Sequence, residues 1–206
     1  MTSVTFTSLS EDVRRYLEAG YSNDPVVYDQ IPRLINLAEQ RIIREIKVTQ
    51  FLRAVTFDTQ IGVASYLKPD RWRETVSMMI DGVPVLPRAY EYIRFVYPDS
   101  VTGQPELYAD YDYQHWLLGP APDDVYTVNL LYYERPEPLS DSNQVSIITE
   151  NMPDLILYAT LLEAAPFMKS DERVQIWQGL YDRAAQALVA EDRGRVLDRG
   201  AQREGN

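Results

Sequence analysis

The chain contains no cysteine and a single histidine among its 206 residues. Without cysteine there is no disulfide framework, no thiolate zinc site and no cysteine nucleophile. The nine glycines form no phosphate-binding loop, and no uncharged apolar run is long enough to span a membrane. The N-terminal residues lack the basic start and apolar stretch of a signal peptide. The sequence therefore predicts a protein that stays in the cytoplasm of the cell that makes it.

Basic residues are also scarce: 20 stand against 31 acidic ones, giving a formal net charge of −11 at pH 7. Proteins that bind DNA tightly usually present a basic surface. This chain should repel nucleic acid over most of its surface, although it could line a path along which DNA slides without sticking. Its 15 tyrosines suit surfaces that are half apolar and half wet.

Few residues are candidates for catalysis or metal binding. A Ser-His-Asp triad would have to use His115, and no nucleophile elbow accompanies it, so a surface or packed histidine is favoured. Asp110 and Asp112 would share a face of a strand, where paired carboxylates can bind a divalent cation or act as acid and base. No calcium-loop glycine surrounds them, which favours a solvated face. The sequence predicts no catalytic, cofactor or metal site, and hence no enzyme.

The two ends of the chain have helical periodicity. Ser8 or Ser10 can cap a short first helix, and Asp29 can cap a longer one that reaches about residue 47 with Pro32 in its first turn. Asn151 can cap a later helix. The apolar positions of the longer helix and of the last one recur three and four apart: Ile31, Ile35, Ala38, Ile42 and Ile46; and Val174, Trp177, Tyr181, Ala184 and Leu188, after a cap at Ser170.

Between these ends the apolar period changes to two. The clearest strand covers residues 126–133, and residues 75–80 and 83–86 flank Asp81-Gly82, a dipeptide that favours a two-residue hairpin turn. Pro84 would place the second of these strands at a sheet edge. We therefore predict an α+β fold in which N- and C-terminal helices form a bundle and the middle is an antiparallel β-rich insertion. The predicted domains are residues 1–50 with 140–192, the insertion 51–139, and an extended C-terminal arm 193–206.

The predicted arm and two tryptophans are the candidate interface residues. Arg193, Arg195, Arg199 and Arg203 are balanced by four acidic residues, so the segment is either a frayed helix end or an arm whose guanidinium groups bind polar grooves on a partner. Trp72 and Trp116 could stack on sugars, but aromatic residues in strands more often belong to sheet packing or to interfaces.

Several stretches together resemble the head-to-tail adaptor, or connector, proteins of podophages, a group of tailed bacteriophages. They are the helix of residues 31–46, the turn 69–72 leading to the hairpin at 79–82, the cluster 119–124 followed by 126–136, and the segment 152–158 that continues through 164–169 to Trp177 and Tyr181. The similarity covers roughly residues 25–195, and the order of these motifs is more specific than any one of them.

The resemblance implies a structural virion protein of the head-to-tail interface, made in the cytoplasm of the host bacterium. Such adaptors form a ring of about twelve copies beneath the portal protein. The ring extends the DNA channel without binding DNA specifically, and it offers a platform for the tail nozzle and tail fibres. The family supplies no catalytic residues, no cofactor and no membrane contact.

Three other interpretations stay open at this point. One is a different tail-completion ring subunit. Another is a module whose β insertion recognises a carbohydrate or a receptor. The last is a hydrolase that uses Asp110 and Asp112 as its carboxylate pair.

Overall fold

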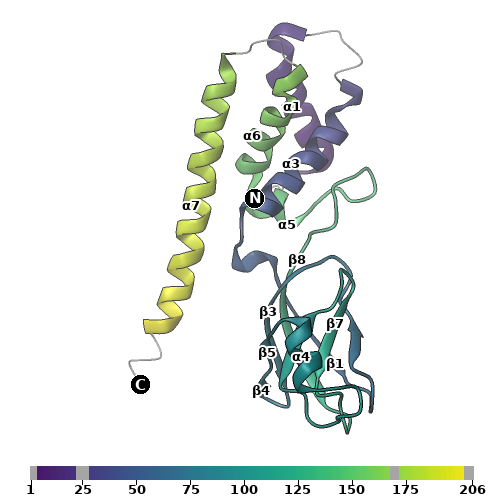
Figure 1. Cartoon of the computed structure of the whole chain (residues 1–206). Helices are drawn as coiled ribbons and strands as arrows, with labels where there is room; N and C mark the ends of the chain where they lie inside the picture. Colours follow the sequence, from purple (N-terminus) through teal and green to yellow (C-terminus); the bar gives the residue numbers. More distant parts are fainter. Residues whose placement is uncertain (1–3, 22–27, 168–171, 202–206) are drawn as a thin grey trace. The chain divides into compact units, whose positions relative to one another are not determined.

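Apart from one short helix at residues 90–96, helices and strands occupy separate stretches of the chain in the computed structural model, which describes residues 4–21, 28–167 and 172–201 (Figure 1). The predicted α+β class is confirmed. Two compact units divide the chain: Met1–Gln50 with Pro136–Asn206, and Phe51–Arg135. We call them the helical unit and the β unit.

The helical unit is built around α6, a helix that is apolar on every side. It contacts the other helices of the unit, and its residues Leu155, Ile156 and Ala159 are buried. A helix without a polar face must be surrounded by other elements, and this explains its central place. The described elements are α1 (Phe6–Tyr21), α3 (Ile31–Glu45), the turn η1 (Thr49–Phe51), α5 (Ile147–Asn151), α6 (Pro153–Ala164), η2 (Ala165–Phe167) and α7 (Arg173–Ala201).

The predicted apolar faces are largely confirmed. All five predicted positions of α3, from Ile31 to Ile46, are buried. On α7, Trp177 and Tyr181 are buried, whereas the other three predicted positions are only partly covered. Pro32 lies in the first turn of α3, as expected.

Three predicted helix caps are wrong. At α1 the side chain of Thr5, rather than Ser8 or Ser10, accepts from the amide of Ser8 at 3.1 Å. The cap position of α3 is Gln30 rather than Asp29, and it makes no side-chain cap bond. The helix predicted to follow Asn151 is α6, and its cap position is Met152, which makes no side-chain cap bond. Asn151 instead ends α5, a helix capped by Ser146 that sequence periodicity did not indicate. Ser170 lies outside the described residues.

A second correction concerns the C-terminal end. Residues 193–201 continue α7 as helix rather than forming an extended arm. The segment has no proline, and its two glycines, Gly194 and Gly200, lower helix stability without ending the helix. Residues 202–206 lie outside the described part of the chain.

A buried carboxylate holds the connection from the β unit back to the helices. Glu39 of α3 is 2 % exposed, and its Oε2 accepts from the amide of Leu139 at 3.1 Å. Burial raises the pKa of Glu39 to about 7, although the hydrogen bond from Leu139 lowers it. Leu139 is itself buried and falls in the helical unit, which begins again at Pro136 rather than at residue 140.

The β unit contains two four-stranded sheets. The first has the strand order β1-β8-β3-β4 and is antiparallel throughout. The second has the order β2-β7-β6-β5, and its β5 and β6 are parallel, so the predicted antiparallel insertion is mixed. The strands are β1 (Leu52–Asp58), β2 (Ser65–Leu67), β3 (Trp72–Ile80), β4 (Val83–Pro84), β5 (Leu86–Pro87), β6 (Leu107–Asp110), β7 (His115–Gly119) and β8 (Thr127–Glu134).

The predicted hairpin forms at Asp81-Gly82. Both residues have positive φ, 48° and 81°, which is the geometry that a two-residue turn between twisted strands requires. Pro84 lies on the edge strand of the first sheet, as predicted. The strand predicted over 83–86 is, however, split: β4 stays in the first sheet and β5 joins the second, with the buried Val85 between them.

The two sheets enclose the core of the β unit. Alternate residues of β7 point to opposite faces: Trp116 and Leu118 join the core, whereas Leu117 packs with Ile93 of α4 (Tyr90–Val96). A Cβ on Gly119 would lie 2.4 Å from Cγ2 of Ile93, so glycine permits the close approach of this helix. The buried core residues are Met78, Ile80, Val85, Tyr108, Trp116, Leu118, Val128, Leu130 and Tyr132.

Candidate interaction surfaces

Trp116, one of the two candidate interface tryptophans, is a core residue. Its side chain is 0 % exposed, and its indole nitrogen has no hydrogen-bond partner among the described residues. As an inward residue of β7 in the middle of a sheet sandwich, it cannot meet a partner. The expectation that it belongs to an interface is therefore wrong, and sheet packing explains its presence.

Trp72, the other candidate, is partly buried at the start of β3. Its ring lies edge-on to Trp116, with centroids 6.1 Å apart, and Nε1 donates to Thr75 Oγ1 at 3.2 Å. The ammonium group of Lys68 lies 4.0 Å from the Trp72 ring centroid. This cation–π contact covers a face of the indole that a sugar would need for stacking.

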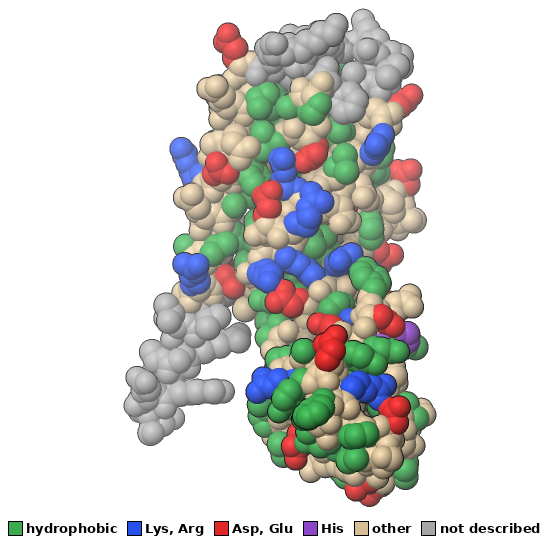
Figure 2. All heavy atoms as spheres, viewed as in Figure 1, with side chains coloured by type: hydrophobic (Ala, Val, Ile, Leu, Met, Phe, Trp, Pro, Cys, Tyr) green, Lys and Arg blue, Asp and Glu red, His purple; other side chains and the backbone are tan. Residues whose placement is uncertain are grey.

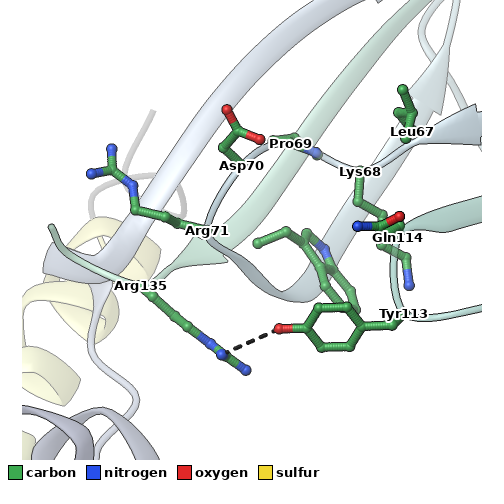
Figure 3. A pocket seen from close by; sticks show the side chains of 9 residues that line it. Leu67, Lys68, Pro69, Asp70, Arg71, Tyr113, Gln114 and Arg135 are labelled. Carbon is green, nitrogen blue, oxygen red and sulfur yellow. Dashed lines mark hydrogen bonds between the residues drawn. The ribbon is translucent and has the colours of Figure 1, made fainter.

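A pocket of about 200 Å³ opens beside Trp72 (Figure 3). We call it the Trp72 pocket. Three cationic side chains and one carboxylate line it, although the protein as a whole is acidic. In Figure 3 the Arg135 guanidinium and the Tyr113 hydroxyl point toward one another, and Nη1 donates to that hydroxyl at 3.4 Å. The lining residues are Leu67, Lys68, Pro69, Asp70, Arg71, Trp72, Tyr113, Gln114 and Arg135.

The cations of this pocket differ in how they are paired. Lys68, 4 % exposed, binds Asp110 Oδ1 at 3.1 Å and donates to the carbonyl of Asp112 at 2.7 Å. Arg71 lies 3.4 Å from Glu134. Arg135 has no carboxylate within ion-pair distance among the described residues, and its guanidinium donates to the Tyr113 hydroxyl instead.

Charges of both signs lie near Arg135, and the described guanidinium that senses its charge is that of Arg73. Burial lowers the pKa of the neighbouring Arg73; the charge of Glu74 raises it, and the charge of Arg135 lowers it again. The two guanidinium groups thus repel each other. A carboxylate placed at Arg135 would relieve this repulsion.

Four aspartates gather at the opposite end of the first sheet. Asp58 ends β1 and accepts from the hydroxyl of Thr127 at 3.0 Å, and Asp81 accepts from the Thr127 amide at 3.1 Å. Asp123 accepts from the Tyr126 hydroxyl at 2.7 Å. That bond, burial and the charges of the nearby aspartates together raise the pKa of Tyr126 to about 12. We call this group the acidic end: Asp58, Asp81, Asp123 and Asp124, all exposed.

Asp110 and Asp112 do not form a two-carboxylate site. Asp110 pairs with Lys68. Asp112 accepts from the amides of Gln114 and His115, each at 2.7 Å, and its Oδ2 lies 2.9 Å from Nδ1 of His115. The bonds of Asp112 stabilise the turn between β6 and β7. The structural roles of Asp110, Asp112 and His115 are thus explained without a catalytic or metal-binding function.

Two carboxylate contacts, at Tyr181 and at Asp192, hold α7 to earlier parts of the helical unit. The Tyr181 hydroxyl donates to Glu45, and the Asp192 carboxylate accepts from the amide of Thr49 at 2.9 Å as well as from its hydroxyl. Arg193 is exposed and lines a groove of about 460 Å³ beside Tyr181. Arg195 and Arg199 lie on the same helix, whereas Arg203 lies outside the described residues.

Exposed apolar side chains are concentrated in the β unit. Of the 17 large hydrophobic side chains that are exposed among the described residues, 14 belong to this unit, and Figure 2 shows hydrophobic atoms over much of its visible surface. Helix α4 is an example: Ile93 faces the second sheet, while Tyr92 and Phe95 are 49 % and 85 % exposed. Contiguous exposed apolar surface is typical of interaction sites.

Two kinds of site were not found in the described part of the chain. Nowhere there do three or more histidine, aspartate or glutamate side chains converge as metal ligands would. None of the helices within residues 4–21, 28–167 and 172–201 has both the length and the apolar character of a membrane span.

Sequence reasoning missed the residues that make the Trp72 pocket basic. Arg71 lies in the 69–72 turn that the sequence does single out, and its φ of 58° is unusual for a residue with a side chain. Arg135 is 64 positions away in sequence. Only the pairing of β3 with β8, which sets Trp72 opposite Glu134, brings the two arginines to one place.

Comparison with known protein families gives a match. The family described as SU10 adaptor protein matches this chain over residues 4–203. A search of curated proteins finds no match.

Proposed function

Because the chain belongs to the SU10 adaptor protein family, a family of phage adaptors with a structural role, we propose that it is a ring subunit at the head-to-tail interface of a tailed phage. About twelve copies bind beneath the portal protein, in keeping with the closed cyclic symmetry of such assemblies. The ring extends the DNA channel and is the attachment platform for the tail nozzle and the tail fibres.

The observation that carries this proposal, besides the family, is the exposed apolar surface of the β unit. Surfaces rich in valine, tyrosine and phenylalanine are costly to leave in water and are typical of interfaces that become buried on assembly. Phe95, Leu67 and Tyr113 are each more than two-thirds exposed. A subunit that meets neighbours on several sides accounts for this surface better than an isolated enzyme does.

The charge of the chain supports a channel role. With a net charge of −11, a ring of copies presents a negative surface to passing DNA, which lowers adhesion. The basic side chains of the Trp72 pocket are mostly paired, so they add little attraction for a phosphate backbone.

The test is assembly with the portal protein of the same phage. Purified chain and portal are mixed over a range of salt concentrations, and the product is imaged by electron microscopy. We expect an added ring at the tail-facing side of the portal. If the chain fails to bind portal at every salt concentration, the proposal is wrong; if it forms a ring at another level of the tail, it is instead a different tail-completion subunit.

A further inference from the structure

The first sheet of the β unit carries opposite charge features at its two ends. β1 and β8 pair from Leu52 opposite Tyr133 to Asp58 opposite Thr127. The Trp72 pocket therefore lies at one end of these strands and the acidic end at the other, about 20 Å away at 3.3 Å per residue. The two features are too far apart to meet within one copy.

The Trp72 pocket has a guanidinium without a carboxylate partner, and the acidic end has carboxylates without a cationic partner. Arg135 has no carboxylate partner, and its charge repels that of Arg73. The four aspartates of the acidic end have no cationic partner within ion-pair distance among the described residues, because their bonds go to amides and hydroxyls. Like charges at one end of a sheet repel one another, and a neighbouring guanidinium reduces that repulsion.

The shapes also fit. Asp123, Asp124 and Val125 are consecutive exposed residues in the turn before β8, and Val125 is 58 % exposed. A pocket of about 200 Å³ has room for one or two short side chains. Its rim includes the exposed apolar side chains of Leu67 and Tyr113, which can cover a valine next to a carboxylate.

We propose that the Trp72 pocket of one copy receives the Asp123–Asp124 turn of a second copy of this chain. The two surfaces differ, so the contact is head-to-tail, and such a contact repeated around an axis closes into a ring. This inference rests on the proposed function only in that both require copies of the chain to meet. It names which surfaces meet.

The pocket fits a protein partner better than DNA. The acidic side chains of the β unit outnumber the basic ones, 12 to 7, which repels a phosphate backbone at longer range. Lys68 and Arg71 already have carboxylate partners. Besides Asp70, the pocket then presents one guanidinium without a carboxylate partner, that of Arg135, which is suited to bind a single carboxylate.

The absence of cysteine from the chain permits a direct test. Leu67→Cys and Val125→Cys are combined in one chain, and mild oxidant is added at low ionic strength. Leu67 pairs with His115, and the strand from His115 to Gly119 separates it from the turn by about 13 Å, whereas a disulfide needs Cα atoms within about 7 Å. We expect a ladder of covalent oligomers; each single-cysteine variant can give at most a dimer.

Charge reversal identifies the contact. Arg135→Glu in the double-cysteine chain should reduce the ladder about tenfold or more, because carboxylates then face carboxylates. Asp123→Arg with Asp124→Arg should reduce it likewise, and combining all three reversals should restore it. Glu91→Arg, an exposed change on α4, is the matched control and should leave the ladder unchanged.

The possible results separate this contact from the proposed function. No ladder beyond a dimer, or a ladder indifferent to the reversals, overturns the contact. If electron microscopy shows a portal-bound ring while the ladder is missing, only the contact is wrong. If the ladder forms and responds to charge but no portal-bound ring exists, the contact stands and the proposed function is wrong.

Discussion

The helical unit and the β unit bury their side chains differently. In the described part of the helical unit three large hydrophobic side chains are exposed, against 14 in the β unit. The helical unit instead buries a carboxylate, Glu39, and this burial disfavours the charged form and raises the pKa of Glu39. The helical unit thus covers most of its apolar surface by itself, whereas the β unit exposes apolar surface that partners can cover.

This difference teaches where to look for function in a structural protein. The residues that stabilise the β unit lie between its sheets, and the residues we assign to partners lie outside them. Changes between the sheets should therefore alter stability, whereas changes on the outer surface should alter assembly alone. The predictions below test that separation, beginning with the largest expected effect.

Trp116→Ala should destabilise the β unit by about 3–5 kcal/mol, because it removes a fully buried indole from between two sheets. Urea unfolding followed by tryptophan and tyrosine signals should show an earlier transition. The helical circular dichroism signal should keep its midpoint, because each unit has its own core. Equal loss of helix and β signals would show that the two units unfold together.

Glu39→Gln should stabilise the helical unit at pH 8 by up to about 3 kcal/mol, from a pKa raised to about 7 against an ordinary 4.5. The folded state binds this proton more tightly than the unfolded chain does, so wild-type stability is full below about pH 4.5 and falls as the pH rises to about 7. The variant should lack this fall in helix stability.

The control for that experiment is Glu150→Gln, an exposed carboxylate of the same unit. It should leave the pH profile unchanged. If Glu39→Gln has the wild-type profile as well, Glu39 is ionised in the folded protein at neutral pH and its environment is more polar than the structure indicates.

Asp192→Ala should cost about 1–3 kcal/mol, because the carboxylate accepts two bonds from Thr49. Removing residues 195–206 keeps that contact and should change the urea midpoint of the helices by less than Asp192→Ala does. If the C-terminal arginines contact the portal protein, the truncated chain should bind portal more weakly even though its helices stay folded. A truncation that melts the helices would place the end of α7 in the folding core instead.

Phe95→Ala should change stability by less than about 0.5 kcal/mol, because the ring is 85 % exposed. If α4 is part of an interface, the same variant should weaken assembly with portal. Leu37→Ala, at an exposed position of the helical unit, is the matched control. Equal effects of the two variants on assembly would argue against the division of roles between the units.

Local signals in the sequence predicted local structure well. The Asp81-Gly82 turn needs only two adjacent residues with positive φ, and the face of α3 needs only a period of three and four. Both could be predicted because neighbouring residues alone determine them. The caps were harder: the cap position of α6 is Met152, which makes no side-chain cap bond, rather than the predicted Asn151 one residue earlier, although Asn is the residue type that favours such a position.

Features that depend on distant residues could not be predicted. Trp116 and Trp72 have the same chemistry, and only the alternation along β7 buries one of them. Glu39 lies on the apolar side of α3, but its burial depends on a chain that returns 100 positions later. The Trp72 pocket likewise joins side chains from β2, β3, the β6–β7 turn and the end of β8.

The β unit begins and ends on paired neighbours, since Leu52 lies opposite Tyr133 across β1 and β8. Its entry and exit points are thus only one strand spacing apart, about 5 Å. A segment with such closely spaced ends can be exchanged by recombination for another of different length without moving the helices that flank it. Related phages could in this way change what the β unit contacts while retaining the helical unit unchanged.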